Sequence, residues 1–187
     1  MDARTLKIAV LVAAHAIFLS AAALRILRGR RGHQLTAQAP GWIQYYPPLV
    51  WVPFLLAYFL PFPVDLDQTA QVAGLALATV SALFAAWAMW SLGTSYGIRT
   101  DIFEGHRLVT SGPHAIVRHP MYLGIVLYYV GATLVLRSPL LLVLTALVVA
   151  PYTAIRIAYE ERALHLAFGE GYTAYQARVP ALLPFVR

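Results

Sequence analysis

Five long apolar runs divide this sequence, and they restrict the chain to folds that place helices in a lipid bilayer. The runs cover residues 6–27, 42–60, 68–92, 121–136 and 139–158. A helix that spans the hydrocarbon core needs about 20 mostly apolar residues. Lipid offers an exposed backbone no hydrogen bonds, so each run is expected to be helical. The sequence therefore predicts an all-α, polytopic integral membrane protein with about five transmembrane helices.

The composition agrees with this prediction. Hydrophobic residues make up 60% of the 187 residues and charged residues 12%, with no cysteine. Soluble domains carry about 25% charged residues, and a chain without cysteine forms neither disulfides nor thiolate metal sites. The basic residues stand at the ends of apolar runs and form no stripe, so we expect lipid contacts and no nucleic-acid binding.

The runs differ in regularity. Residues 6–27 are too long for a signal-peptide core, so we interpret them as a retained membrane anchor. Pro47, Pro48 and Pro53 interrupt the second run and predict a helix that starts late or kinks. Only Arg137 and Ser138 separate the last two runs, which predicts an antiparallel helical hairpin.

The arginines indicate the orientation. They gather at the ends of the first, third and fifth runs: Arg25, Arg28, Arg30 and Arg31; Arg99, Arg107 and Arg118; Arg156, Arg162, Arg178 and Arg187. Basic residues favour the cytoplasmic side, so we expect the N-terminus outside and the C-terminus in the cytoplasm. A chain rich in alanine and arginine but poor in lysine suggests a GC-rich bacterium, hence a bacterial inner membrane.

We expect a single membrane domain over 1–187. Residues 1–92 would form three transmembrane helices, and 93–187 a motif-bearing catalytic region with the hairpin and a cytoplasmic tail. Leu164, Phe168, Tyr172 and Tyr175 recur at steps of three and four residues. This spacing predicts an amphipathic helix that folds over a cytoplasmic cofactor pocket and is ended by Val179-Pro180 and Pro184.

Charged groups are expected to converge beneath this helix. Arg118 and His119 precede the fourth run, and Arg156, Glu160 and Glu161 end the fifth. A hairpin brings these ends together, and polar groups that converge in an apolar pocket are typical of a small-molecule site. Each of these groups, taken alone, also has an explanation that involves no ligand site. Arg156 and Glu160 could form an ordinary ion pair one helical turn apart, and the tyrosines could be interfacial anchors.

Histidines in the segment 93–120 raise the question of a metal site. His106, His114 and His119 are separated by eight and five residues, with no cysteine nearby. These spacings match no common zinc pattern, so we expect no metal and histidines that face lipid headgroups.

Several blocks together resemble the isoprenylcysteine carboxyl methyltransferase family. They are LVTSG at 108–112, RHPMYLG at 118–124, EERAL at 160–164 and FGEGYTAYQARVPALLP at 168–184. That family belongs to a wider group of integral-membrane methyltransferases that includes phospholipid N-methyltransferases. The resemblance covers roughly the C-terminal half of the chain. One departure is His114, which stands where relatives usually have tyrosine.

The resemblance implies S-adenosylmethionine as cofactor, although the chain lacks the glycine-rich signature of soluble nucleotide-binding folds. The residues expected to bind it are Leu108, Val109, Gly112, Arg118, His119, Pro120, Tyr122, Glu160, Leu164 and Tyr175. Arg156 is the candidate for gripping an acceptor carboxylate, because guanidinium offers a planar two-donor fork. Glu161 would hold either Arg156 or the cofactor amine.

The sequence does not identify the methyl acceptor. It is expected to be a lipophilic small molecule or a prenylated substrate that enters from the bilayer, with methyl transfer to oxygen, nitrogen or sulfur. The first interpretation is the carboxylate of an isoprenylcysteine or a related isoprenoid; phospholipid amines and small thiols are alternatives. Two further possibilities are an NADPH-dependent membrane reductase, whose family ends in a similar pattern, and a non-catalytic membrane protein.

Overall fold

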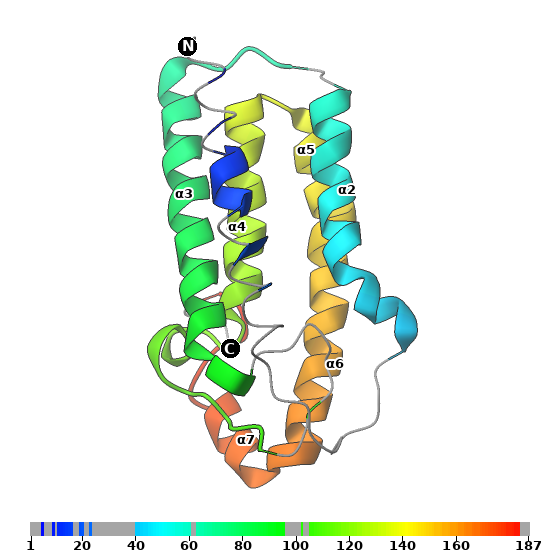
Figure 1. Ribbon diagram of the computed structural model, residues 1–187, viewed down its shortest axis with the longest axis vertical. Coiled ribbons are helices and arrows are strands. Elements are labelled where there is room, and N and C mark those ends of the chain that lie inside the picture. The colour runs from blue at the N-terminus through cyan, green and yellow to red at the C-terminus, as the bar shows by residue number, and fades with distance from the viewer. Residues whose placement is uncertain are drawn as a thin grey trace.

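The computed structural model describes residues 5, 9, 11–16, 19, 20, 23, 40–60, 63–95, 102 and 105–183. Every secondary-structure element assigned within these residues is helical, and the long helices run side by side as an elongated bundle (Figure 1). The elements are η1 (Gly41–Tyr45), α2 (Tyr46–Phe59), α3 (Gln68–Ser91), η2 (Gly93–Ser95), η3 (Gly112–Ala115), α4 (Pro120–Leu136), α5 (Pro139–Leu144), η4 (Thr145–Val149), α6 (Ala150–Phe168) and α7 (Glu170–Gln176).

Three of the apolar runs form the helices that the sequence predicts. α3 and α4 match the runs 68–92 and 121–136 almost residue for residue. The second run begins with the short 3-10 helix η1, and α2 begins only at Tyr46, so the predicted late start is confirmed. Most of the run 6–27 lies outside the described residues, but residues 11–16 of it are helical.

The fifth run continues as a helix well beyond the predicted end. α5, η4 and α6 form one helix of 30 residues, which ends at Phe168 and not at residue 158. The charged residues from Glu160 onward suggested an end, but a helix can continue beyond the lipid once its side chains meet water. η4 is a π-helical turn directly before Pro151, where the extra residue accommodates a proline that cannot donate to the preceding turn.

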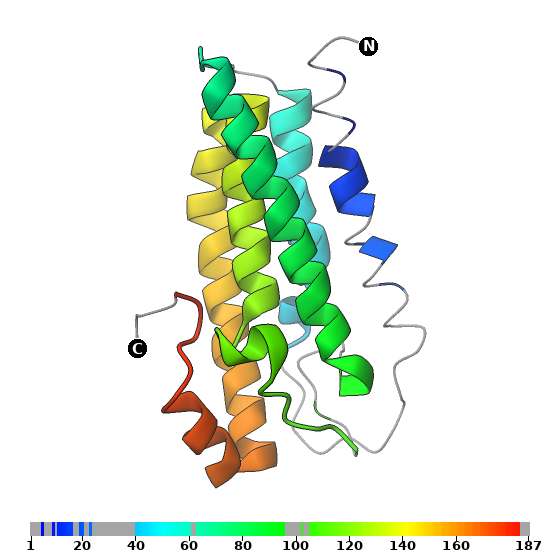
Figure 2. The ribbon, with the colours of Figure 1, turned by 90° about the vertical axis from the view of Figure 1, so that its left-hand side faces the viewer.

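The predicted amphipathic helix from residue 159 onward is wrong as a single element. Gly169 has φ of 51° and ψ of −125°, and this conformation separates α6 from the short helix α7. Glycine adopts such positive φ values without the steric cost that a Cβ atom brings. α7 consequently lies beside the lower end of α6 (Figures 1 and 2), with Tyr172 and Tyr175 buried.

The predicted hairpin between the last two runs is confirmed. Arg137 caps α4 in the left-handed conformation, with φ of 55°. Ser138 then caps α5, and its side chain accepts a hydrogen bond from the backbone of Leu141 at 3.2 Å. The turn is therefore tight enough to place the start of α4 and the end of α6 at the same end of the bundle.

α3 and α4 approach so closely that glycine is required where they cross. A Cβ atom at Gly131 would lie 2.6 Å from the backbone nitrogen of Ala78 and from the carbonyl oxygen of Gly74. At Gly124, a Cβ atom would lie 2.7 Å from that of Ala85. Small residues at such interfaces let helix backbones touch, which is how helices associate in lipid.

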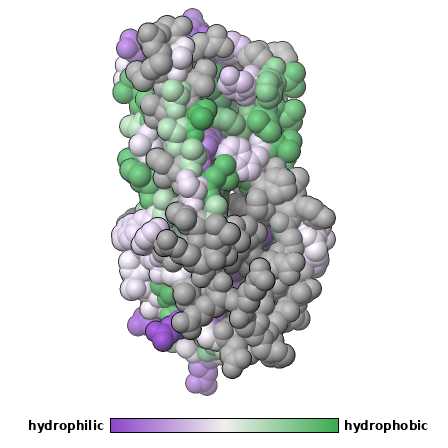
Figure 3. Space-filling model, in the orientation of Figure 1, coloured by the Kyte–Doolittle hydropathy of each residue, from purple (hydrophilic) through white to green (hydrophobic). Residues whose placement is uncertain are grey.

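The surface is suited to lipid. Within the described residues, Gln68–Ser91 and Pro139–Phe168 are long and apolar enough to cross a bilayer, while α4 is shorter. Large apolar side chains on these helices face outward, including Val80 and Leu147, which are 64% and 71% exposed. Hydrophobic residues gather along the upper half of the molecule (Figure 3). Such a surface would promote aggregation in water and is stable against lipid tails.

Substitution of Gly131 tests this packing. Gly131→Ala should lower the free energy of unfolding by about 1–3 kcal/mol, because the added methyl group overlaps backbone atoms that cannot move away. Gly171→Ala is the matched control, since no atom lies within 4 Å of a Cβ placed there. Thermal unfolding in detergent measures both. Equal unfolding midpoints for the two variants would contradict the close helix crossing.

Candidate functional site

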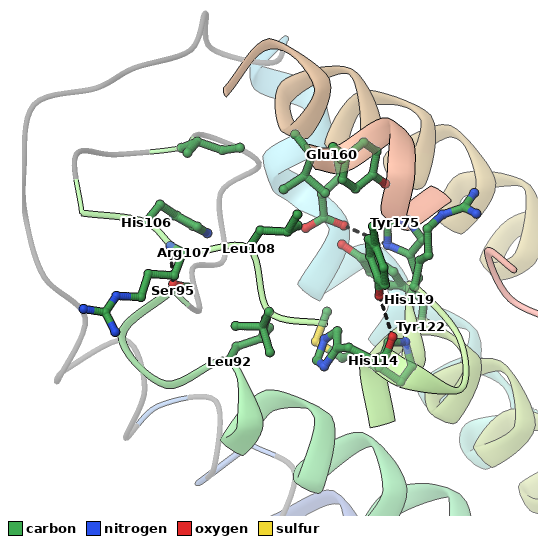
Figure 4. Close-up of a pocket in the computed structure, with 17 residues that line it drawn as sticks. Leu92, Ser95, His106, Arg107, Leu108, His114, His119, Tyr122, Glu160 and Tyr175 are labelled. Atoms are coloured by element: carbon green, nitrogen blue, oxygen red, sulfur yellow. Dashed lines mark hydrogen bonds and ion pairs between the residues drawn. The ribbon is translucent and has the colours of Figure 1, made fainter. Parts of the chain in front are cut away.

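A cavity opens at the end of the bundle where α3 finishes and α4 begins. It encloses about 810 Å³ of empty space, a figure that includes the open solvent at its mouth. Its walls come from the end of α3, the loop 105–109, η3, the first turn of α4, α6 and α7 (Figure 4). Segments far apart in the sequence therefore build one concave site.

The structure brings together all the predicted cofactor residues except one. Leu108, Val109, Arg118, His119, Pro120, Tyr122, Glu160, Leu164 and Tyr175 line the cavity. The exception is Gly112, which has φ of 61° and turns the chain against Trp87, 3.6 Å from the position of a Cβ atom. Gly112 thus shapes the loop that carries His114 and does not face the cavity.

Arg118 joins three segments around the cavity. Its guanidinium contacts the Glu161 carboxylate on α6 at 2.8 and 2.9 Å. It also donates to the backbone carbonyls of Gln176, at 3.2 Å, and Val179, at 2.5 Å. The backbone N–H of Arg118 donates to Pro180 at 2.8 Å. This one side chain therefore fixes the start of α4 to α6 and to the tail after α7.

His119 lies between two carboxylates. Its Nδ1 is 3.6 Å from Glu160 and its Nε2 is 3.1 Å from Glu161, while the side chain is only 5% exposed. Burial alone would lower the pKa of His119, but the hydrogen bonds and negative charges of Glu160 and Glu161 raise it above 6.5. Both ring nitrogens face an acceptor, which suits the protonated imidazolium.

His114 is a cavity residue that the sequence analysis missed. It is buried, its Nδ1 lies 3.1 Å from the Ser91 hydroxyl, and its carbonyl accepts a hydrogen bond from Tyr175 at 2.6 Å. The prediction of headgroup-facing histidines is therefore wrong here, and His106 also lines the cavity. Burial and the nearby charge of His119 lower the pKa of His114 to about 4, so it is neutral at pH 7. The sequence feature that could have indicated His114 as a cavity residue is its position directly after the Gly112-Pro113 turn.

Tyr172 was also missed as a site residue. Its side chain is fully buried at the cavity wall. Burial and the Glu161 carboxylate near its hydroxyl raise its pKa, but the hydroxyl makes no hydrogen bond of normal geometry among the described residues. A buried hydroxyl without a partner costs about 1–3 kcal/mol. Its spacing from Leu164 and Phe168 indicates only a buried helix face, and this spacing is no reason to prefer Tyr172 to Tyr175 as a site residue. A ligand in the cavity would supply the missing partner.

Arg156 and Glu161, the predicted catalytic pair, lie behind the cavity wall and do not pair with each other. Arg156 is 3% exposed and donates to the Tyr122 hydroxyl at 2.7 Å and to the carbonyl of Ile43 at 2.8 Å. Glu161 instead contacts Arg118, His119 and Gln176. Glu161 therefore does not hold Arg156 in place, contrary to the prediction. It holds Arg118 and His119, which line the cavity.

Comparisons with known proteins define the class. Residues 69–171, more than half of the chain, match the phospholipid methyltransferase family. The chain belongs to this family of membrane methyltransferases. The matched segment runs from α3 to α7 and so includes most of the cavity wall.

Several named relatives of the chain are protein-S-isoprenylcysteine O-methyltransferases. The chain is 43% identical over 83 residues to protein-S-isoprenylcysteine O-methyltransferase B of Arabidopsis thaliana, covering 44% of this chain and 42% of the relative. It is 33% identical over 141 residues to protein-S-isoprenylcysteine O-methyltransferase of Xenopus laevis, covering 73% of this chain and 48% of the relative. The solved structure of a eukaryotic intramembrane Ras methyltransferase, isoprenylcysteine carboxyl methyltransferase, matches with TM-score 0.61 and 27% identity, covering 79% and 55%. The chain thus spans about half the length of the curated relatives it matches.

The His119 environment predicts a dependence of stability on pH. Because the raised pKa favours the imidazolium in the folded protein, its contribution is full below pH 6.5 and is lost as the pH rises through the folded-state pKa. The unfolding midpoint in detergent should fall as the pH rises above 6.5. In His119→Gln this fall should disappear. His165→Gln is the control, because the hydrogen-bond partner of His165 among the described residues is the neutral amide of Gln176. A wild-type profile that rises over this range would refute the charged arrangement.

Proposed function

We propose that this protein is an S-adenosylmethionine-dependent methyltransferase that methylates the carboxylate of an isoprenylcysteine or a related isoprenoid amphiphile. Membership of the family supports methyl transfer, and the names of the most similar relatives support this acceptor. The observation that carries the proposal is a cavity that combines the Glu160 carboxylate with aromatic side chains and with the Tyr172 hydroxyl, which has no hydrogen-bond partner among the described residues.

The residues of the cavity fit the proposed cofactor. Glu160 offers a carboxylate to a cationic group, and Tyr122 and Tyr175 offer aromatic faces that attract a cation by about 0.5–2 kcal/mol. Tyr172 can donate its free hydroxyl to a carboxylate or ribose oxygen. His114 is neutral and adds no positive charge. Bound there, S-adenosylmethionine would supply a methyl group whose bond to sulfur breaks as its bond to a carboxylate oxygen forms.

The reaction requires the acceptor and the methyl donor to be aligned, and it needs no proton transfer. An acceptor carboxylate is ionised at neutral pH, so no general base is required. Holding two reactants in line can lower such a barrier by about 7–11 kcal/mol. The Arg118, His119 and Glu161 contacts would keep the cavity wall rigid, and α7 would close it against water. In this proposal, Glu161 acts through the residues it holds.

Arg156 is proposed to bind the acceptor carboxylate. Its guanidinium contacts the hydroxyl of Tyr122, a residue of the cavity wall, and stands one turn before Glu160 on α6. A positive charge at this depth would attract an anionic acceptor that arrives from the bilayer. Tyr122 would then separate the cofactor side of the site from the acceptor side.

The remaining features of the proposal concern the membrane. We propose five membrane spans in a single domain, with the N-terminus outside and the C-terminus in the cytoplasm of a bacterial cell. The arginine distribution supports this orientation, because the cavity then faces the compartment that holds the water-soluble cofactor. A second candidate is methylation of a phospholipid amine, which the description of the matched family favours.

Substitution of Arg156 separates the two acceptors. Arg156→Ala should raise the KM for a prenylcysteine carboxylate about tenfold or more, since a lost charge-assisted hydrogen bond costs about 1.5–3 kcal/mol and 1.4 kcal/mol is one decade. Cofactor affinity should stay within a few-fold. Tyr122→Phe is the matched control, because it removes the hydroxyl partner of Arg156 and keeps the charge.

The assay is steady-state methylation with a prenylcysteine analogue and a lipid amine offered in parallel. Turnover of the carboxylate that is indifferent to Arg156→Ala would refute the role of Arg156. Turnover of the lipid amine alone would replace the proposed function with phospholipid methylation.

A further inference from the structure

A second cavity lies deeper in the apolar part of the bundle. It holds about 390 Å³ including its mouth and is bounded by the N-terminal helical segment 11–16, α2, α3 and α4. Ala82, Ala85 and Gly124 form a wall of small side chains, and Trp51 lies among the other residues that line it. Figure 1 shows the N-terminal segment in blue over α4, between α3 and α2. An apolar space of this kind holds apolar ligands better than water.

The two cavities border the same face of α4 at different heights. On α4, Met121 and Tyr122 line the first cavity, and Ile125, Tyr128 and Tyr129 line the second. Steps of three and four residues place these side chains on one side of the helix. On α3, Leu92 lines the first cavity and Ala85, two turns away, the second. From Tyr122 to Tyr129 the path is about 10 Å at 1.5 Å per residue.

His15 closes the far end of this path. Its Nδ1 lies 2.9 Å from the carbonyl oxygen of Leu11 and within hydrogen-bond distance of the Tyr128 hydroxyl. The imidazole also packs against Trp51, Phe54 and Tyr128, with ring centroids 4.3, 4.4 and 4.6 Å apart. The Nδ1–H, shared between the Leu11 carbonyl and the Tyr128 hydroxyl, and three ring contacts hold the imidazole in one position. Polar side chains at membrane depth are costly, so an imidazole fixed in this way calls for a functional explanation.

We infer that the second cavity holds the apolar tail of the acceptor and that His15, fixed by Tyr128, sets the longest tail the enzyme accepts. This inference rests on the function proposed above. An acceptor whose carboxylate lies at Arg156, behind Tyr122, would extend its tail along the same face of α4, past Ile125. Tail carbons beyond about 10 Å would meet the imidazole and would have to displace it from its hydrogen bonds.

Methylation of S-geranyl, S-farnesyl and S-geranylgeranyl cysteine analogues tests the inference. His15→Ala should raise kcat/KM for the longest tail relative to the shortest about tenfold or more, because each added methylene in an apolar pocket is worth about that factor. Tyr128→Phe, which releases His15 but keeps the ring, should shift the ratio in the same direction by less. Ile125→Phe narrows the path and should lower the ratio. Leu142→Ala, on the lipid-facing surface at 49% exposure, is the control and should leave it unchanged.

The outcomes separate this inference from the function on which it rests. If the analogues are methylated with the same tail preference in wild type, His15→Ala and Ile125→Phe, the second cavity does not hold the tail and the inference is overturned. If wild-type protein methylates a lipid amine but none of the analogues, the proposed acceptor is overturned, and the tail assignment with it.

Discussion

The ion pair between Arg118 and Glu161 is the contact on which the cavity depends. It joins the start of α4 to α6, residues 43 positions apart, and Arg118 also holds the tail after α7 through backbone carbonyls. Both side chains are largely buried, and loss of one partner in such a pair costs about 3–5 kcal/mol. Without Arg118, Glu161 would keep its contacts with His119 and Gln176 but lose its arginine partner, and the tail after α7 would lose its hydrogen bonds to Arg118 beside the cavity.

The bundle supplies a rigid frame for that contact. Glycine and alanine let α3 and α4 touch along their length, so the end of α3 and the start of α4 are held together where the cavity opens. The apolar outer surface is therefore suited to contact with lipid, and the charged cluster is suited to contact with water. Lipid stabilises the helices, and the water-facing end collects Arg118, His119, Glu160 and Glu161 around one site.

Much of this arrangement could be predicted from the sequence, and the failures have physical causes. Apolar length alone predicted α3, α4 and the hairpin, because hydrocarbon thickness fixes helix length. The extension of α6 to Phe168 depends on where the helix leaves the lipid for water, and the break at Gly169 depends on one backbone conformation. The spacing of apolar residues along the sequence indicates neither. Family motifs identified the cavity residues but not the contacts of Glu161 or Arg156. The pairing of Glu161 with Arg118 depends on how α4 and α6 are rotated, and spacing along one helix carries no such information.

The most direct test is ligand binding to the purified protein in detergent, measured by calorimetry with S-adenosylmethionine and with NADPH. A methyltransferase site of the proposed kind binds S-adenosylmethionine and not NADPH. Tyr172→Phe removes a hydroxyl that has no hydrogen-bond partner among the described residues, and it should weaken binding by about tenfold, the value of one hydrogen bond to a charged group. Folded wild-type protein that binds NADPH but not S-adenosylmethionine would contradict the account and identify the cavity as that of a membrane reductase.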